Sequence, residues 1–395
     1  VMQRSSQQPC TACAFVLRQE QERCACPASH ALPQTRDAMP IPSSHNAARL
    51  VPAIGVDPLM SERYVMPPEW AEQEWLWIGF PHDAALWEDD LAPAQEQIAA
   101  FANAVAQSGQ QVRLVVRNEA NAAQACTLVG DDVVIELHPY GDIWLRDIGP
   151  VIVMNEAGQR RAQGFGFNGW GGKYRLEGDQ ETAASLAAAA RMEFARTDWI
   201  LEGGAIDGDG TGLVVTTQQC LLNPNRNPSL TRDNISSRLR RDLGFGEILW
   251  LGDGLAGDHT DGHVDNLARF VAPGEIAIPV ADDASDPNAD IYADAMSRAE
   301  AYGLKVYAIP SPGLASGLVQ QGEDAEPASY MNFVIANTVV IVPIYGAEND
   351  AEAVRAIGDL FPGRKAIGLR ADAVLTGGGS FHCASQHMPK ALTSS

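Results

Sequence analysis

The sequence predicts an α/β fold in which five similar units are arranged around one axis. From about residue 66 onward, helical periodicities alternate with short apolar runs in the order strand, strand, helix, strand. This order of elements recurs, although the amino-acid sequence of the units does not, and each unit ends in a polar motif. Radial repetition of such units would bring one polar residue from each motif to a shared cavity. These residues, spaced 51 to 69 positions apart, are Asp147, Glu202, His263, Asn332 and Cys383.

The bulk composition is that of a soluble globular protein, and its acidic charge is a hint toward a cationic substrate. The chain has 395 residues, of which 46% are apolar and 20% are charged. No run approaches the 18 apolar residues of a membrane span, and the formal charge of −22 argues against nucleic acid as a partner. An acidic protein concentrates small cations near its surface. The seven cysteines form no disulfide framework, which indicates a reducing, cytoplasmic location.

Residues 1–59 differ from the rest of the chain. They are rich in Ser, Gln, Pro and Ala and show no sustained periodicity. We interpret them as a disordered leader that need not belong to the native protein, because Met60 is a plausible start. Residues 60–395 would then form a single catalytic domain.

The first unit begins with a buried strand over residues 75–80. A helix is expected over 92–108, because Pro93 falls in its first turn and Gly109 follows its last. A strand over 112–116 completes this part of the sheet.

The later units repeat this order. Helices are expected over residues 181–194, 232–243, 290–302 and 351–361, and the strands that follow them over 199–201, 248–251, 306–309 and 366–369. Between these segments, hairpin-like pairs are expected at 212–216 with 220–222 and at 333–335 with 339–343. The stretch 207–211 is expected to be a hairpin turn.

Two acidic residues follow strand ends in the predicted motifs. Asp147 closes a segment that contains Trp144 and Arg146, and a carboxylate beside an indole suits a planar cation. The alternative is a surface turn with an Arg–Asp pair. Glu202 stands directly before two glycines, and its alternative is a charged residue at a turn. Both carboxylates are candidate site residues.

A third motif contains the candidate histidines. His259 and His263 stand four residues apart with Asp265 nearby, a spacing that could bind a metal ion. However, an Asp-Gly pair between the histidines would break the helix that such a site needs. In an extended segment, His263 and Asp265 would point the same way. This arrangement favours His263 as a general acid/base acting on a substrate that Asp265 holds.

The motif near the C-terminus supplies the candidate nucleophile. Three glycines at 377–379 precede Cys383, and a glycine run can turn backbone amides toward one point. A cysteine just past such a turn can be a reactive thiolate, although free cysteines are often buried core residues. Because four other polar motifs occupy the equivalent position, we predict that Cys383 faces the shared cavity.

With these residues in place, the chain closely resembles the agmatine deiminase and bacterial-type peptidylarginine deiminase family of guanidine-modifying enzymes. The resemblance covers about residues 66–389 and implies a five-bladed α/β propeller of ββαβ units with pseudo-fivefold symmetry, the pentein fold. It also implies a homodimer that needs no cofactor or metal. It rests on seven ordered motifs: Met66-Pro-Pro-Glu-Trp70, Asp142-Ile-Trp-Leu-Arg-Asp147 with Gly149-Pro150, Phe167-Asn-Gly-Trp-Gly-Gly-Lys-Tyr174, Leu201-Glu-Gly-Gly204, Thr260-Asp-Gly-His-Val-Asp265, Ser329-Tyr-Met-Asn-Phe333 and Gly377-Gly-Gly-Ser-Phe-His-Cys383.

The same resemblance implies a role for each candidate residue. Cys383 would be the nucleophile and His263 the general acid/base. Asp147 and Asp265 would bind the guanidinium, and Glu202 would orient the histidine and support the substrate. The expected substrate-binding residues are Trp144, Trp170, Asn332 and Gly378.

The resemblance also bears on the substrate. Peptidylarginine members carry a pair of arginines shortly after an asparagine, which hold a substrate carboxylate. Here Asn168 is followed by Gly-Trp-Gly, so we expect agmatine, which has no carboxylate. The product would be N-carbamoylputrescine with ammonia, formed through a Cys-linked thiouronium in polyamine metabolism. The alternatives are deimination of peptidyl-arginine or another guanidine, a metal-dependent hydrolase, and a non-catalytic guanidine-binding protein.

Overall fold

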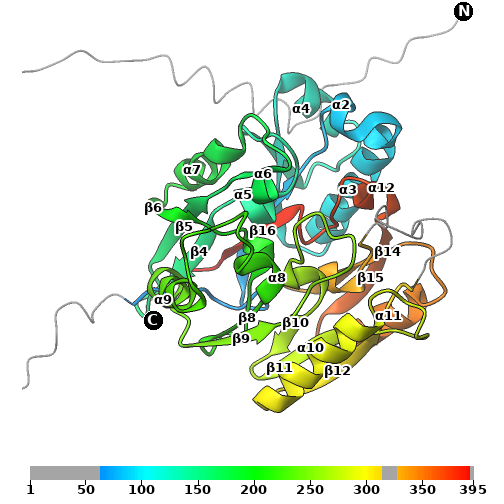
Figure 1. Cartoon of the computed structure of the whole chain (residues 1–395). Coiled ribbons are helices and arrows are strands. Elements are labelled where there is room, and N and C mark those ends of the chain that lie inside the picture. Colours follow the sequence, from blue (N-terminus) through cyan, green and yellow to red (C-terminus); the bar gives the residue numbers. More distant parts are fainter. Residues whose placement is uncertain (1–62, 314–326, 392–395) are drawn as a thin grey trace, which may run out of the picture.

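The computed structural model describes residues 63–313 and 327–391 as a mixed α/β fold (Figure 1). The predicted leader at 1–59 and the proposed start at Met60 lie outside these residues. In the described ranges, no helix combines the length and the apolar character that a membrane span requires.

Four of the five described sheets have three strands joined in one common order. The first strand pairs antiparallel with the second, a helix follows, and the third strand pairs parallel with the second. The elements are β4 (Val151–Met154), β5 (Arg160–Gly166), α7 (Asp179–Ala189), β6 (Glu193–Ile200); β7 (Asp207–Gly208), β8 (Leu213–Thr217), α9 (Arg232–Leu243), β9 (Glu247–Leu251); β10 (Arg269–Ala272), β11 (Glu275–Val280), α10 (Ala289–Tyr302), β12 (Lys305–Pro310); and β13 (Val334–Ile335), β14 (Val339–Ile344), α11 (Asp350–Leu360), β15 (Lys365–Arg370).

The remaining sheet joins the two ends of the described chain. Its strand order is β16-β1-β2-β3, and β16 pairs antiparallel with β1 while β1 pairs parallel with β2. This sheet therefore follows the same order as the others, with an antiparallel pair, a helix and a parallel pair. Its first strand, β16, comes from the far end of the chain. The elements are β1 (Gln73–Gly79), α2 (Ala84–Trp87), η2 (Glu88–Asp90), α3 (Leu91–Gln107), β2 (Gln111–Val116), α4 (Glu119–Ala125), β3 (Val133–Leu137) and β16 (Ser385–Pro389).

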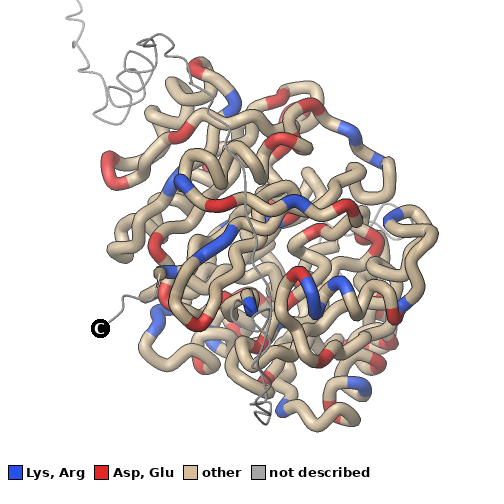
Figure 2. The backbone as a smooth tube through the Cα atoms, turned by 90° about the vertical axis from the view of Figure 1, so that its left-hand side faces the viewer, with Lys and Arg blue, Asp and Glu red and all other residues tan. Residues whose placement is uncertain are grey.

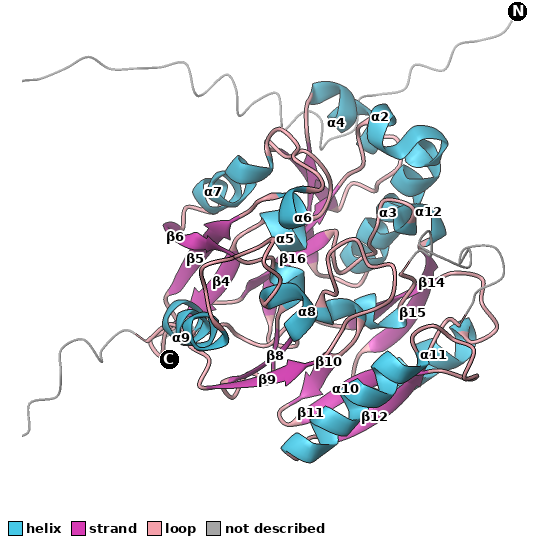
Figure 3. Cartoon of the chain, in the orientation of Figure 1, coloured by secondary structure: helices cyan, strands magenta, loops and turns pink. Residues whose placement is uncertain are grey.

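Short helical turns carry the polar motifs. Figure 3 shows the longer helices α7, α9, α10 and α11 on the outside of the molecule, whereas the short helices α5, α6 and α8 lie nearer its centre. Asp147 lies within one such turn, and Glu202 and His263 directly precede two others. Asn332 ends a fourth turn. The short elements are α5 (Leu145–Ile148), α6 (Gly169–Gly172), η3 (Gly203–Ala205), α8 (Gln218–Leu221), η4 (Val264–Asn266), η5 (Tyr330–Asn332) and α12 (Asp372–Leu375).

Most predicted elements are confirmed within one or two residues, and α9 matches its predicted bounds. Its ends show why, because Thr231 and Asn234 form a capping box at the start and Gly244 at φ 78° ends the helix. The hairpin expected at 333–335 with 339–343 is confirmed as β13 and β14, and 207–211 includes a turn between β7 and β8.

Four local predictions are wrong. The helix expected over 181–194 ends at Ala189. The strand expected over 199–201 is β6, which begins at Glu193 and ends at Ile200. Residues 220–222 do not form a strand, because the Thr217 side chain accepts a hydrogen bond from the Cys220 amide and starts the helical turn α8. The segment between His263 and Asp265 is a 3₁₀ turn rather than extended, so strand alternation does not bring their side chains together.

Acidic residues are spread over the molecule. Figure 2 shows Asp and Glu on many separate segments of the viewed face, with Lys and Arg between them. In this view, the acidic residues are therefore spread along the backbone rather than confined to one segment.

Candidate active site

A cavity of about 780 Å³, measured to its open mouth, reaches the C-terminal cysteine motif. Aromatic side chains form much of its wall and carboxylates add negative charge. The lining residues include Leu86, Trp87, Asp142, Trp144, Asp147, Trp170, Tyr174, Leu176, His259, Thr260, Thr376, Gly377, Gly378 and Cys383.

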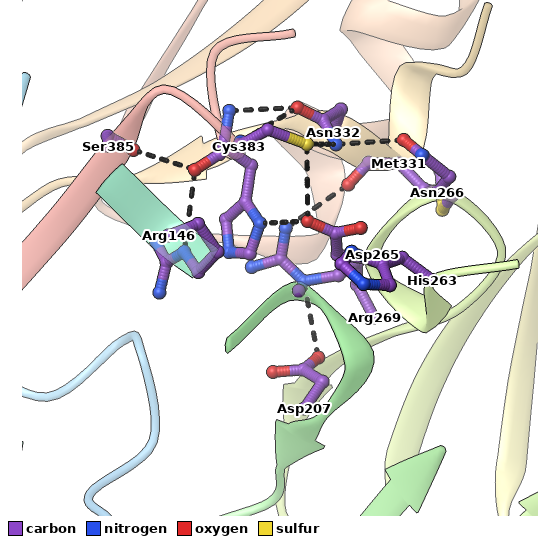
Figure 4. Close-up of polar contacts among 12 residues, drawn as sticks. Arg146, Asp207, His263, Asp265, Asn266, Arg269, Met331, Asn332, Cys383 and Ser385 are labelled. Carbon is purple, nitrogen blue, oxygen red and sulfur yellow. Dashed lines mark hydrogen bonds and ion pairs between the residues drawn. The ribbon is translucent and has the colours of Figure 1, made fainter. Parts of the chain in front are cut away.

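The Cys383 sulfur lies between an amide and a carboxylate (Figure 4). The Asn332 Nδ2 donates to Sγ at 3.1 Å, and Sγ lies 3.5 Å from the Asp265 Oδ2. The Asn332 Oδ1 accepts hydrogen bonds from the backbone amides of His382 and Cys383, at 2.9 and 3.2 Å. Asn332 therefore holds both the sulfur and the backbone that carries it.

A buried histidine links Asp265 to a second carboxylate. The His382 Nδ1 lies 2.7 Å from the Asp265 Oδ2, and its Nε2 lies 2.8 Å from the Glu69 Oε2. The same Glu69 oxygen accepts a hydrogen bond from Arg269 at 2.7 Å. These contacts fix one oxygen of Asp265 beneath the sulfur. The other oxygen, Oδ1, is buried and has no hydrogen-bond partner.

Asp147, His263 and Asp265 converge on Gly204. The Asp147 Oδ2 accepts from the Trp170 indole at 2.9 Å, and its Oδ1 accepts from the Gly204 amide at 3.0 Å. A Cβ atom on Gly204 would lie 2.6 Å from the His263 Nδ1 and 3.0 Å from an oxygen of each aspartate. Only glycine leaves room for these three groups to meet.

Glu202 is held by an arginine behind the cavity. The Arg226 Nε donates to the Glu202 Oε1 at 2.7 Å, and both side chains are fully buried. The Glu202 Oε2 has no hydrogen-bond partner, and neither ring nitrogen of His263 has one. Buried polar atoms without partners are uncommon and call for an explanation.

The carboxylates set the protonation states of the thiol and the imidazole. Burial raises the pKa of Cys383 well above its usual range, and the charges of Asp265 and Asp147 raise it further. Burial alone would lower the pKa of His263, but the Asp147 carboxylate, together with the Cys220 and Glu202 side chains, holds that pKa well above its usual value. At neutral pH the free site therefore contains a thiol and an imidazolium.

Indole rings shape the cavity beside the glycine run. Trp87 and Trp144 stack with their ring centroids 6.0 Å apart, and both indoles donate to Asp142, at 3.0 and 2.8 Å. A Cβ atom on Gly377 would lie 2.6 Å from the Trp87 ring, and Gly378 has φ 96°. The glycines therefore allow the cysteine motif to pack closely against the indoles.

The structure brings the predicted site residues together in two layers. Asp147, Trp144, Trp170, Gly378 and Cys383 line the cavity. His263, Asp265, Glu202 and Asn332 are fully buried around these groups. Asn332 thus lies behind the sulfur, although it was expected to line the cavity.

The metal trio considered from the sequence does not assemble. His259 is exposed at the cavity, where its Nδ1 lies 3.4 Å from the Tyr174 hydroxyl, whereas His263 is fully buried. Among the described residues, the one group of three possible ligands that meet within 4.8 Å is Glu202, Cys220 and His263. It contains neither His259 nor Asp265.

No role was predicted from the sequence for three buried residues that hold the site, which are His382, Glu69 and Arg226. His382 was visible as the neighbour of Cys383, but its contact with Glu69 spans 313 positions. Arg226 stands 24 residues beyond Glu202 in a segment without periodicity. A buried arginine between apolar elements is a signal of an internal ion pair, but it does not identify the partner.

Taken together, a buried thiol, an imidazolium and convergent carboxylates in a mixed α/β fold are the groups that a thiol enzyme acting on a cationic substrate would need.

Comparison with known proteins identifies the group to which this enzyme belongs. The family model described as Porphyromonas-type peptidyl-arginine deiminase matches residues 65–389. The chain is 36% identical over 352 residues to an agmatine deiminase of Stutzerimonas stutzeri (82% of this chain, 95% of the relative). It is 35% identical over 350 residues to a protein of Vibrio parahaemolyticus described as a putative agmatine deiminase (82% and 97%).

Solved structures give the same result. An agmatine deiminase of Enterococcus faecalis matches with a TM-score of 0.79 and 33% identity, covering 86% of this chain and 99% of that one. A C. jejuni agmatine deiminase with substrate bound matches with a TM-score of 0.76 and 30% identity, covering 84% and 98%. The chain belongs to the Porphyromonas-type peptidyl-arginine deiminase family.

Proposed function

We propose that this protein is an agmatine deiminase, which hydrolyses agmatine to N-carbamoylputrescine and ammonia. The observation that carries the proposal is the convergence of Asp147, Asp265 and His263 on Gly204, beside the Cys383 sulfur. Two carboxylates can hold a guanidinium in a fixed plane, with its carbon within reach of the thiolate. The agmatine deiminases similar to this chain support the substrate.

The cavity wall favours agmatine over substrates with a carboxylate. Among the described residues that line it, none is Lys or Arg, so no fixed cation is placed to bind a carboxylate. The turn that follows Asn168 holds Trp170 instead, whose indole donates to Asp147. The stacked indoles of Trp87 and Trp144 offer an apolar wall for the methylene chain of agmatine.

The first half-reaction forms a carbon–sulfur bond. Binding of the guanidinium offsets the charges of Asp147 and Asp265, so the Cys383 pKa falls and its proton passes to solvent. The thiolate attacks the guanidinium carbon and gives a tetrahedral adduct. The His263 imidazolium protonates the departing amino group, which leaves as ammonia and yields a thiouronium.

The second half-reaction restores the enzyme. Neutral His263 takes a proton from water, and the resulting hydroxide attacks the thiouronium carbon. The carbon–sulfur bond then breaks, so the Cys383 thiolate leaves and the ureido product forms with loss of a proton. Glu202, held by Arg226, keeps a carboxylate near His263 in both steps.

The architecture proposed with this function is a closed propeller. We propose that the five sheets are blades around one axis and that residues 60–395 form one domain. The common strand order supports this, as does the β16–β1 pairing, which joins the first and last strands. We further propose a homodimer in the cytoplasm, where a reducing environment preserves the thiol.

Turnover with the full chain tests the function. We expect ammonia and N-carbamoylputrescine from agmatine in the presence of a chelator, and much slower turnover of free arginine and of a peptide ending in arginine. Cys383→Ala is expected to lower kcat by at least about 10⁴-fold, because the covalent route is lost. Full activity in Cys383→Ala, or silencing by the chelator, would refute the proposal. Preference for the arginine peptide would instead support peptidyl-arginine deimination.

A further inference from the structure

Three buried donor atoms of different chemistry meet beside the proposed active site. A carboxylate oxygen of Glu202, the sulfur of Cys220 and a ring nitrogen of His263 all lie within 4.8 Å of one another. Glu202 follows β6, Cys220 lies in α8 and His263 precedes η4. All three residues are fully buried, so tertiary structure gathers the cluster away from solvent.

These donor atoms have few partners outside the cluster. The Glu202 Oε1 binds Arg226, but its Oε2 has no hydrogen-bond partner, and the same holds for both ring nitrogens of His263. Cys220 is a free cysteine. The reaction proposed above uses Cys383 as its nucleophile, and no bond forms or breaks at the Cys220 sulfur. An unpartnered carboxylate oxygen, a free thiol and an imidazole form an arrangement that a cation would complete, with release of the His263 and Cys220 protons on binding.

We propose that Glu202, Cys220 and His263 form a binding site for Zn²⁺ or a similar thiophilic divalent cation, and that metal at this site inhibits the enzyme. One nitrogen, one sulfur and one oxygen ligand, with water in the fourth position, match the ligands that Zn²⁺ takes in proteins. Mg²⁺ and Ca²⁺ prefer oxygen ligands alone. Tetrahedral coordination places ligand atoms about 3.3–3.8 Å apart, so donor atoms that lie within 4.8 Å of one another need to close by at most about 1.5 Å.

The charges around the cluster favour a dication. The Asp147 Oδ1 lies 3.7 Å from the His263 Nδ1, and Asp147 also lines the cavity. A metal ion could therefore enter along the route used by the cationic substrate. Arg226 offsets only part of this negative charge, because it binds the other oxygen of Glu202 and also pairs with Asp261.

Inhibition follows from the role of His263 and so rests on the proposed function. A metal ion bound to the imidazole takes the lone pair that must accept a proton from water. It also holds the ring away from the reacting atoms. Metal binding itself does not depend on turnover and can be measured separately.

Cobalt spectroscopy tests binding. Co²⁺ is added to the chelator-treated full chain carrying Cys383→Ser, so that the nucleophile cannot contribute. We expect thiolate-to-cobalt charge-transfer absorption that decreases by one equivalent when Cys220→Ala is added to this protein. Equal absorption and stoichiometry with and without Cys220 would refute the site, whether or not the enzyme turns over agmatine.

Zinc inhibition tests the consequence. Agmatine turnover is measured at increasing Zn²⁺ concentrations. Each rate is divided by the metal-free rate of the same variant. Cys220→Ala is expected to raise the half-inhibiting Zn²⁺ concentration by at least about 100-fold, because loss of an outer-shell partner alone costs about 10–100-fold in metal affinity. Cys220→Ser keeps the volume of the side chain and replaces the alanine variant should that one fail to fold.

Two comparisons separate this site from others. His259→Ala removes the exposed histidine at the cavity and is expected to leave inhibition unchanged. Equal zinc sensitivity in the wild type and in both Cys220 variants would mean that zinc acts through Cys383, and the proposal would be wrong.

Discussion

At the scale of single residues, Asp147 has two opposing effects. In the proposed reaction its charge attracts the cationic substrate, yet the same charge raises the pKa of Cys383 in the free enzyme. The resting thiol is therefore protected from reaction with neutral electrophiles, because the thiolate is the reactive form.

Asp147→Asn is expected to change turnover and alkylation in opposite directions. The variant should lose at least about 100-fold in kcat/KM for agmatine, because a charged contact that holds the guanidinium is removed. Alkylation of Cys383 by neutral iodoacetamide at neutral pH should become faster, because the thiol pKa falls. Mass spectrometry of the peptide that contains Cys383 measures the second effect.

Asp142→Asn is the matched control for alkylation. Asp142 also lines the cavity, but it binds the indoles of Trp87 and Trp144. We expect the alkylation rate of Cys383 in this variant to match that of the wild type. An unchanged rate in Asp147→Asn would show that its charge does not control the thiol.

The candidate site residues could be predicted from the sequence, whereas most of the buried residues that hold them in place could not. Asp147, Glu202 and Cys383 could be found because each stands in a polar motif next to an apolar run. His382, Arg226 and their partners could not, because a buried ion pair depends on packing between segments far apart in the chain.

At the scale of elements, β16 connects the cysteine motif to the core sheet. All of its residues are buried, and His387 on this strand pairs with Leu76 of β1. Burial lowers the pKa of His387 to about 3, and the nearby Arg146 guanidinium adds to this effect. The folded protein therefore keeps this imidazole neutral under mildly acidic conditions.

His387→Gln is expected to make the fold less sensitive to acid. Between the folded pKa of about 3 and the ordinary value of about 6.5, the unfolded chain binds one more proton at this position. Stability thus falls by about 1.4 kcal/mol per pH unit as the pH drops through this window, and glutamine removes that contribution. Denaturant midpoints at about pH 6 and about pH 5 measure the change.

The exposed His259 provides the comparison for this experiment. His259→Gln makes the same substitution at a side chain that is exposed in the folded protein, and the effect of His387→Gln is compared with it. If the denaturant midpoint of His387→Gln changes with pH as steeply as that of the wild type, His387 is not held neutral by the fold.

Element prediction succeeded where local signals agreed and failed where a side chain competed with the periodicity. For α9, the cap at Thr231, the apolar face and Gly244 all indicate the same bounds. At residues 220–222, the run after β8 has strand-like composition, but the Thr217 hydroxyl starts a helical turn. Composition alone does not reveal which of these two interactions prevails.

At the scale of the whole molecule, one buried arginine ties several elements together. Arg269 at the start of β10 is fully buried and donates to Glu69 at 2.7 Å and to Asp207 at 3.2 Å. It also donates to the carbonyl oxygens of Met331 and Phe333, at 3.1 and 2.8 Å. The arginine thus joins the segment before β1 to β7 and to the region of η5.

Arg269→Met is expected to destabilise the protein by about 3–5 kcal/mol. The substitution leaves the carboxylates of Glu69 and Asp207 buried without their main partner. Denaturant unfolding followed by tryptophan fluorescence measures the loss. Arg238→Met, which removes an ion pair with the exposed Asp198, should leave the midpoint nearly unchanged. Comparable midpoints for the two variants would show that the internal network contributes little.

The pairing of β16 with β1 has a consequence for protein synthesis. Cys383 lies two residues before β16, whereas Asp147, Glu202, His263 and Asp265 are all translated earlier. A growing chain therefore acquires its acidic groups and its imidazole long before its sulfur, and the last strand must close onto the first before that sulfur is held in place. A ribosome that stalls before this point releases a polypeptide without the thiol, so the chemistry begins only once the final segment has been made and docked.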